Sequence, residues 1–263
     1  MPEAAAPDAA DGLARVPRLP MAGLPVAVLG MDATARLLVE AALSRPRGGR
    51  PLHFTSANGE VLSRCHREPD VARLFADADL ISADGQPMVV ASRVLSRTPL
   101  PERVATTDLF HVAAREAVRL GASFYLLGAT EEENRRAAAR AAALHPELRI
   151  LGRSHGFYEG VALHDKLAEI DALRPDVLWL ALGVPREQAF VRAHGHRLPH
   201  VGAIKTAGGL FNFLSGTRRR APAVVQAAGL EWAWRLAQEP RRLLKRYAVT
   251  NPHAALLLLT RTG

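Results

Sequence analysis

The sequence predicts an α/β fold: a Rossmann-like, mostly parallel sheet covered by helices on both faces, with a helical, basic C-terminal appendage. Five apolar, strand-like runs stop abruptly at short clusters rich in Gly, Asn, Asp or Gln, and four of these clusters lead into helix-like segments. Alternating strands and helices of this length favour a parallel sheet. The five runs are 52–54, 80–82, 124–127, 177–181 and 201–204, and the clusters after them are 55–59, 84–87, 128–130, 183–188 and 208–209.

These clusters are expected to meet in space. Right-handed crossovers place the carboxyl ends of all parallel strands at one edge of the sheet, where α/β proteins bind their ligands. Residues that lie far apart in the chain would then line one crevice.

The bulk composition fits one large α/β domain with an appendage. The chain has 263 residues, of which 48% are hydrophobic and 23% charged, and its mean hydropathy is near zero, which argues against an integral membrane protein. A single cysteine, Cys65, leaves no internal disulfide and fits a reducing cytosol. Neither a signal-peptide pattern nor a run of the roughly 20 apolar residues that span a bilayer is visible.

Composition divides the chain into three parts. We expect residues 1–23 to form a mobile Ala/Pro-rich tail, 24–214 the α/β domain with the site, and 215–263 a basic, Trp-containing appendage.

The appendage carries most of the net charge of +8, because residues 215–263 hold nine basic and only two acidic side chains. Trp232, Trp234 and Tyr247 lie in the same stretch. Basic residues interleaved with Trp and Tyr suit an anionic membrane surface, where indole rings settle at the headgroup level. The alternative is a basic helix pair packed on its own domain; nucleic acid is less favoured.

Helix boundaries are readable at several positions. Asp32 is expected to cap a helix through residue 43, and Asp108 to start another that Gly121 ends. Thr130 and Glu133 have the spacing of a capping box, with acidic residues at the positive end of the helix dipole.

Several familiar chemistries are absent from the sequence. There is no G-x-G-x-x-G after the first strand, no P-loop, no G-x-S-x-G and no C-x-x-C, which disfavours dehydrogenases, NTPases, serine hydrolases and dithiol enzymes. His194, His196 and His200 cluster without a nearby carboxylate, so we interpret them as a polar loop. Asp77 and Asp79 resemble a metal-binding D-x-D but precede their strand, at the wrong edge.

Asp84 is the leading candidate for chemistry. It follows a buried-looking strand and precedes Gly85, Gln86 and Pro87, near which a helix begins. A carboxylate in this place can act as a general base in the crevice. The alternative is an N-cap of the following helix, and spacing alone leaves both open.

An ordered set of motifs resembles the WecG/TagA/CpsF glycosyltransferases from about residue 24 almost to the C-terminus. The set comprises the segments 55–58, 84–85, 101–108, 183–188, 208–213, 220–222, 229–232, 235–236 and 239–242. The resemblance, closest to exopolysaccharide-type members, implies an inverting, metal-independent enzyme without a cofactor. It would move a hexosyl, N-acetylhexosaminyl or uronosyl group from a UDP-sugar onto a polyprenyl-diphosphate-linked saccharide during surface polysaccharide synthesis. It further implies a cytoplasmic protein, peripheral at the inner face of the plasma membrane. The oligomeric state stays open, a homo-oligomer included.

The family's roles carry over to matching positions. Asp84 matches the proposed catalytic base, and Arg103 an arginine near the sugar-nucleotide phosphates. Asn58 matches the asparagine of a T-x-N motif whose threonine position falls on Ser56, with Thr55 one residue earlier. No metal ligand is implied.

Two motifs depart from the family pattern. The usual P-K-Q-E turn here places Glu187 before Gln188, which leaves open which of them touches the donor sugar. The Asp of G-G-x-F-D-F becomes Asn212, which still forms hydrogen bonds but carries no charge. The glycine-containing loops at Gly128 and Gly209 are expected to bring backbone N–H groups close to phosphate.

The arginines of the appendage are expected to contact UDP phosphates, the acceptor diphosphate or lipid; they are Arg218, Arg219, Arg220, Arg241 and Arg242. A non-catalytic module that binds nucleotide-sugar or lipid on the same fold is the alternative function, because a fold does not fix an activity.

Overall fold

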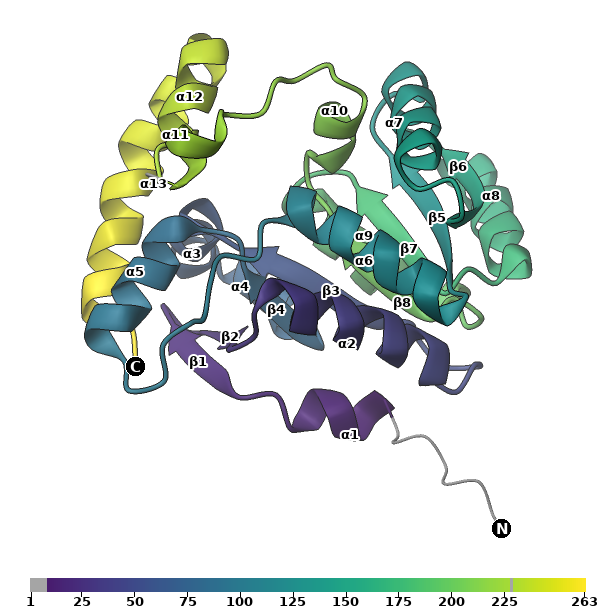
Figure 1. Cartoon of the computed structure of the whole chain (residues 1–263), viewed down its shortest axis with the longest axis horizontal. Coiled ribbons are helices and arrows are strands. Elements are labelled where there is room, and N and C mark those ends of the chain that lie inside the picture. Colours follow the sequence, from purple (N-terminus) through teal and green to yellow (C-terminus); the bar gives the residue numbers. More distant parts are fainter. Residues whose placement is uncertain (1–8, 228) are drawn as a thin grey trace.

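The computed structural model describes residues 9–227 and 229–263 and confirms the α/β class (Figure 1). Its eight-stranded sheet has the order β1-β2-β4-β3-β8-β7-β5-β6. The β1–β2 hairpin is antiparallel and the other neighbouring pairs are parallel. The strands are β1 (Arg18–Met21), β2 (Leu24–Ala27), β3 (Leu52–Ala57), β4 (Leu80–Ala83), β5 (Ser123–Gly128), β6 (Arg149–Ser154), β7 (Val177–Ala181) and β8 (Ala203–Thr206).

Helices connect the strands and cover both faces of the sheet, as expected (Figure 1). Up to β8 they are α1 (Ala9–Ala14), α2 (Met31–Ser44), α3 (Gly59–Arg67), α4 (Pro69–Ala76), α5 (Gln86–Leu95), α6 (Thr106–Leu120), α7 (Glu131–Leu144), α8 (Gly160–Leu173), α9 (Arg186–His194) and the short 3₁₀ helix η1 (Gly195–Arg197). After β8 follow α10 (Leu210–Leu214), α11 (Ala223–Ala227), α12 (Glu231–Gln238) and α13 (Pro240–Thr260).

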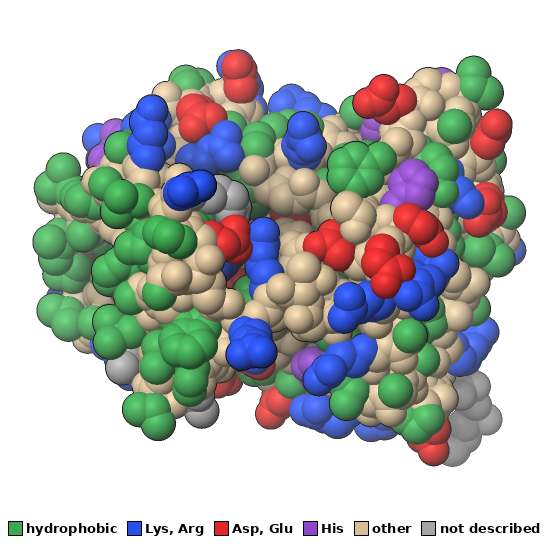
Figure 2. Space-filling model, turned by 90° about the horizontal axis from the view of Figure 1, so that it is seen from above, with side chains coloured by type: hydrophobic (Ala, Val, Ile, Leu, Met, Phe, Trp, Pro, Cys, Tyr) green, Lys and Arg blue, Asp and Glu red, His purple; other side chains and the backbone are tan. Residues whose placement is uncertain are grey.

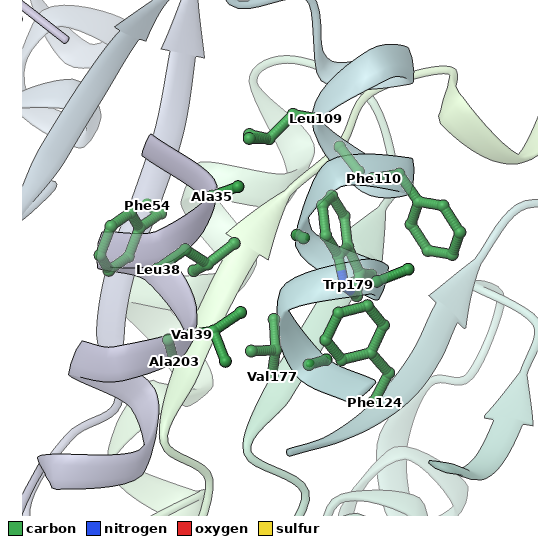
Figure 3. Packing of buried hydrophobic residues seen from close by; sticks show 14 of the residues in the cluster. Ala35, Leu38, Val39, Phe54, Leu109, Phe110, Phe124, Val177, Trp179 and Ala203 are labelled. Atoms are coloured by element: carbon green, nitrogen blue, oxygen red, sulfur yellow. The ribbon is translucent and has the colours of Figure 1, made fainter. Parts of the chain in front are cut away.

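The core is built from strands that are buried on both faces. Alternate residues of a strand point to opposite faces, so Phe124 of β5 packs under α6 while Tyr125 packs with α8 residues. Figure 3 shows the first face, where Phe110 of α6 lies against Phe124 and Trp179, and Leu38 of α2 lies nearby. The centroids of the Phe110 and Trp179 rings are 5.0 Å apart in an edge-to-face arrangement. This packing holds the central strands rigidly and fixes where their ends lie.

Two of the four helix signals are confirmed and two are wrong in detail. Gly121 ends α6 with φ of 71°, and Thr130 and Glu133 form both bonds of the capping box. Asp32 forms no capping bond, because α2 already begins at Met31 with Gly30 as its N-cap. Asp108 lies inside the first turn of α6, which begins at Thr106. Both acidic side chains still suit the positive end of a helix dipole.

The expected mobile tail needs correction from residue 9 onward; residues 1–8 lie outside the described chain. Residues 9–14 form α1, and Arg18–Met21 form the edge strand β1. Leu19 and Met21 are buried and alternate with exposed Arg18 and Pro20, the pattern of an antiparallel strand with one solvent-facing side. A proline is tolerated there because the strand lies at an edge.

The C-terminal helices form the expected helical appendage, which lies beside α3 and α5 (Figure 1). Leu257 and Leu258 of α13 join the cluster that contains Met21 of β1, and Met21 also bridges Thr262. The edge strand β1 and the C-terminal end of the chain are therefore packed together. Among the described helices, none has the length and apolar character needed to cross a membrane.

Candidate active site

A cavity of about 770 Å³ lies at the carboxyl edge of the sheet. The segments after β3, β4, β5, β7 and β8 all contribute to its wall, which confirms the predicted convergence of the five clusters. Residues of α12 and α13 close it on the other side, so the appendage forms part of the wall. Figure 2 shows charged side chains of both signs around a hollow near the centre of this face.

Asp84 lies in the wall of this cavity, directly after β4. Its backbone N–H donates to the carbonyl of Ala57 at 2.7 Å, which ties the turn to the end of β3. Its Oδ2 accepts from the backbone N–H of Thr106 at 3.1 Å, so the carboxylate lies at the N-terminus of α6. The alternative that Asp84 caps the following helix is wrong, because Gly85 is the N-cap of α5.

Arg103 lies between two carboxylates. Its Nε and Nη2 atoms donate to Oδ1 of Asp84 at 3.4 and 3.2 Å, and its Nη1 donates to Oε2 of Glu231 at 2.7 Å. Burial opposes the charge of the guanidinium, but the two carboxylates outweigh it and raise the pKa of Arg103. Glu231 opens α12, so this ion pair connects the carboxyl edge of the sheet with the appendage.

Ser56 and Thr55 lie at different depths. Ser56 lines the cavity, and its hydroxyl is 3.1 Å from that of Thr106. Thr55 is fully buried behind the wall, where it accepts hydrogen bonds from Thr206 Oγ1 at 2.7 Å and Gln188 Nε2 at 3.1 Å. Ser56 is therefore the hydroxyl of this pair that is placed to meet a ligand.

The exchanged Glu and Gln of the 183–188 turn also differ in position. Glu187 is among the residues that line the cavity, whereas Gln188 lies behind it and holds Thr55. The Oε2 atom of Glu187 accepts from the backbone N–H groups of Gly183 at 3.1 Å and Gly208 at 2.9 Å. Burial of this carboxyl raises its pKa above the usual range.

Asn58, Gly209 and Asn212 line the cavity as well. Asn58 also caps α3, because its Oδ1 accepts from the backbone N–H of Val61 at 3.1 Å. Asn212 donates from Nδ2 to Oε1 of Glu133 at 2.6 Å, which brings α10 against α7. Gly128 is not in the wall: it packs against β7, while the two residues after it line the cavity.

The arginines predicted to contact phosphate or lipid lie in different surroundings. Arg218 lines the cavity, with its Nε 3.0 Å from Oε1 of Glu239. Arg220 lies outside the cavity and forms a two-pronged ion pair with Asp108 of α6. Arg219 and Arg241 are exposed, and Arg242 lies on α13 next to Arg241.

Two aromatic residues of the appendage, Trp232 and Tyr247, line the cavity. Trp232 lines the cavity and packs edge-to-face on Tyr247, with ring centroids 6.2 Å apart. Arg235 and Arg246 also reach the wall, and Arg246 pairs with Glu60 of α3 at 3.1 Å. The appendage thus supplies cationic and aromatic groups to the cavity in addition to the surface that was expected.

Sequence reasoning missed several wall residues and one buried lysine behind the wall. Thr106, Glu231, Trp232, Arg235 and Arg246 were not assigned to the site, although the first four lie in the quoted family motifs. Their place in the wall depends on partners far away in the chain. The buried residue is Lys205 of β8, and here a signal existed: a lysine inside an apolar strand just before Gly208.

The residues around the cavity offer the electrostatics needed to bind an anionic ligand. The first residues of α6, α7 and α9 lie at or near its wall, and helix N-termini favour negative charge. Among the described residues, no group of three or more His, Cys, Asp or Glu side chains is arranged to hold a metal ion.

A carboxylate and an arginine are paired at the carboxyl edge of a parallel sheet, in a large cavity lined by both arginines and carboxylates. This arrangement fits an enzyme that transfers a group to a hydroxyl. Comparison with known sequences defines the class further. The pattern of the Glycosyl transferase WecG/TagA/CpsF family matches residues 19–262, so the chain belongs to this family and is a glycosyltransferase.

Two curated relatives support the same assignment. The chain is 29% identical over 205 residues to an N-acetylglucosaminyldiphosphoundecaprenol N-acetyl-beta-D-mannosaminyltransferase of Bacillus spizizenii (strain ATCC 23059 / NRRL B-14472 / W23), with 78% of each chain covered. It is 28% identical over 202 residues to the enzyme of the same name from Bacillus subtilis (strain 168), with 75% of this chain and 77% of the relative covered.

Proposed function

We propose that this glycosyltransferase moves a sugar from a UDP-sugar to a saccharide carried on polyprenyl diphosphate, with inversion and without a metal ion, in the synthesis of a surface polysaccharide. The observation that carries the proposal is the Asp84 carboxylate, held by Arg103 and by the N-terminus of α6 in the wall of the cavity. The acceptor class follows the names of the two relatives, which act on a diphosphoundecaprenol-linked sugar.

In the proposed step, Asp84 acts as a general base. The acceptor hydroxyl attacks the anomeric carbon of the donor while its proton passes to the carboxylate of Asp84. A new C–O bond forms, the bond between that carbon and the β-phosphate oxygen breaks, and UDP leaves with the bonding electron pair. A single displacement of this kind inverts the anomeric centre.

The wall offers compensation for the charge that develops on UDP. Arg103 and Arg218 line the cavity, where Arg103 is paired with Asp84 and Arg218 with Glu239. The loop at Gly209 and the helix N-termini add oriented backbone groups that require no rearrangement during the reaction. Removal of one such donor from an enzyme typically lowers kcat by about 10²–10³-fold.

The position of the appendage supports an acceptor delivered from a lipid surface at the inner face of the plasma membrane. Its helices combine exposed apolar side chains, such as Leu256 and Leu259 of α13, with the exposed Arg241. Hydrophobic side chains gather at the left of Figure 2, the side on which Figure 1 places α13 and α5. Exposed Val90 and Val94 of α5 extend this apolar side.

A panel of UDP-sugars tests the proposal. Purified protein is incubated with each sugar and a polyprenyl-diphosphate-linked N-acetylglucosamine, and UDP release and product mass are measured. UDP-N-acetylmannosamine comes first because of the names of the relatives. Absence of acceptor-dependent UDP release with the whole panel, on a range of lipid-linked saccharides, would contradict the proposal.

Asp84→Asn then tests the role of the base. The amide cannot take up the proton, so kcat should fall by about 10²–10⁴-fold, while UDP affinity stays within a few fold. Asp32→Asn is a matched control, since Asp32 is exposed on α2 and outside the cavity wall. Full turnover by Asp84→Asn would remove the assigned role.

A further inference from the structure

Lys205 is a charged residue in the interior that the proposed reaction does not yet use. It lies in the middle of the sheet on β8, between β3 and β7, and its side chain is fully buried. A lysine that gives up water in this way needs hydrogen-bond partners and is found in proteins chiefly where its charge has a role.

The ammonium group of Lys205 reaches the carboxyl edge of the sheet. Its Nζ donates to Oγ of Ser56 and to the carbonyl of Thr206, both at 2.9 Å. The hydroxyl of Ser56 is in turn 3.1 Å from that of Thr106. Ser56 and Thr106 line the cavity, whereas Lys205 lies one layer behind them.

The chemistry of an ammonium group fixes the direction of this chain of hydrogen bonds. A protonated lysine only donates, so Ser56 accepts from Lys205 and its own hydrogen points away, toward Thr106 or the cavity. The hydroxyl hydrogens at the end of the chain are then available to a ligand. The positive charge strengthens them, because charge-assisted and chained hydrogen bonds polarise one another.

The groups that face Lys205 come from three elements. The negative charges of Glu187 on α9 and Asp84 after β4 favour the charged form of Lys205. The positive charge of Lys205 in turn helps to lower the pKa of His53 on β3. Among the described residues, no carboxylate is close enough to form an ion pair with it, and burial lowers the pKa of Lys205 to about 8. Burial also lowers the pKa of His53 to about 4, so His53 is neutral where Lys205 titrates.

We propose that Lys205 is a positioning residue that polarises the hydroxyls of Ser56 and Thr106 toward the cavity, where they donate to a diphosphate oxygen of the donor. The inference rests on the proposed function, because a UDP leaving group gains one unit of negative charge at that diphosphate. A buried cation that acts through two hydroxyls can stabilise the added charge without an exposed lysine. Its effect is therefore larger on the UDP product than on the intact UDP-sugar.

The test compares Lys205→Gln, Lys205→Met, Ser56→Ala and the double variant Lys205→Gln/Ser56→Ala with the wild type. Glutamine keeps a hydrogen-bond donor without the charge, and methionine keeps the length alone. Lys166→Gln is the matched control, since Lys166 of α8 lies outside the cavity wall and pairs with Glu169. Circular dichroism and unfolding curves check that each variant is folded before kinetics are measured.

We expect Lys205→Gln to lower kcat about 10–100-fold, less than loss of a direct donor to the oxyanion. UDP affinity, measured by calorimetry, should fall several times more than donor affinity. The profile of kcat/KM against pH should fall above about pH 8 in the wild type, where Lys205 loses its proton, and this limb should be missing in Lys205→Gln. The double variant should be no worse than the poorer single variant, because both changes break one chain.

A folded Lys205→Gln variant with wild-type kcat, or one that retains the alkaline limb, would overturn the inference. So would additive losses in the double variant, or equal losses of UDP and donor affinity. These results are distinguishable from failure of the proposed function, which would appear as a wild type without transfer. If neither Lys205 variant folds, Ser56→Ala with unchanged UDP affinity and kcat overturns it equally.

Discussion

Arg103 and Glu231 form a short ion pair, with 2.7 Å between Nη1 and Oε2, although they are 128 residues apart in the chain. Arg103 precedes α6 in the α/β unit, and Glu231 opens α12 in the appendage. The guanidinium that contacts Asp84 is therefore the same one that holds the appendage. Docking of the C-terminal helices and the orientation of the Asp84 carboxylate are linked through one side chain.

Glu231→Gln should loosen both the docking of the C-terminal helices and the position of Arg103 against Asp84. Loss of one partner of this half-buried pair should cost about 1.5–3 kcal/mol of local stability, because a charged hydrogen bond is weakened while Arg103 stays largely buried. Hydrogen exchange should rise in α11 and α12, and kcat should fall. Glu169→Gln, which breaks the exposed pair with Lys166, is the control. Unchanged exchange and turnover would show that the ion pair is incidental.

Gly128 should tolerate no side chain. Its φ is 137°, and a Cβ atom would lie 2.3 Å from the carbonyl oxygen of Ala181 on β7. Gly128→Ala should therefore destabilise the fold by about 3 kcal/mol or more. Gly121→Ala is a matched control: its φ of 71° is also positive, but open space surrounds it, so only a backbone cost of about 1–2 kcal/mol is expected. Equal midpoints of urea unfolding for the two variants would contradict this account.

Lys205 should make the free energy of unfolding depend on pH in the alkaline range. Its folded pKa of about 8 lies below the value of about 10.4 in an unfolded chain, so the unfolded state binds more protons between these values. The free energy of unfolding should then rise with pH from about 8 to about 10.4, by about 3 kcal/mol in total. Urea unfolding measures this rise, and Lys205→Met should lack that component. Parallel curves for wild type and variant would refute it.

The basic surface of α13 should bind anionic lipid. Replacing Arg241 and Arg242 by Ala should weaken association with vesicles of phosphatidylglycerol and phosphatidylethanolamine by about 1 kcal/mol for each charge, and lower turnover on a lipid-linked acceptor. The control pair Arg136→Ala and Arg140→Ala removes two exposed charges from α7 instead. Unaltered vesicle binding and unaltered turnover in the α13 variant would leave these arginines without the proposed role.

Much of the fold and the position of the site could be predicted from local patterns. Apolar runs that stop at Gly- and Asp-containing turns marked the parallel strands and their carboxyl edge, and Asp84 was found there. The capping box at Thr130 was equally local. The strand β1 was missed because a short Arg-Leu-Pro-Met segment becomes a strand only when β2 and the end of the chain supply its partners.

The depth and pairing of site residues could not be predicted. Thr55 and Ser56 are neighbours in sequence, yet the alternation of β3 sends one behind the wall and the other into it. In the same way, the sequence could not predict that Glu187 lines the cavity while Gln188 lies behind it.

Local patterns in the chain were enough to predict the class of fold, the edge at which the site lies and the residue types that gather there, because hydrophobic periodicity and turn chemistry are local properties. The folded chain alone reveals that Arg103 joins Asp84 to Glu231 and that Lys205 lies behind Ser56. Those contacts connect segments far apart in the chain, and their energies depend on burial, which no local pattern encodes.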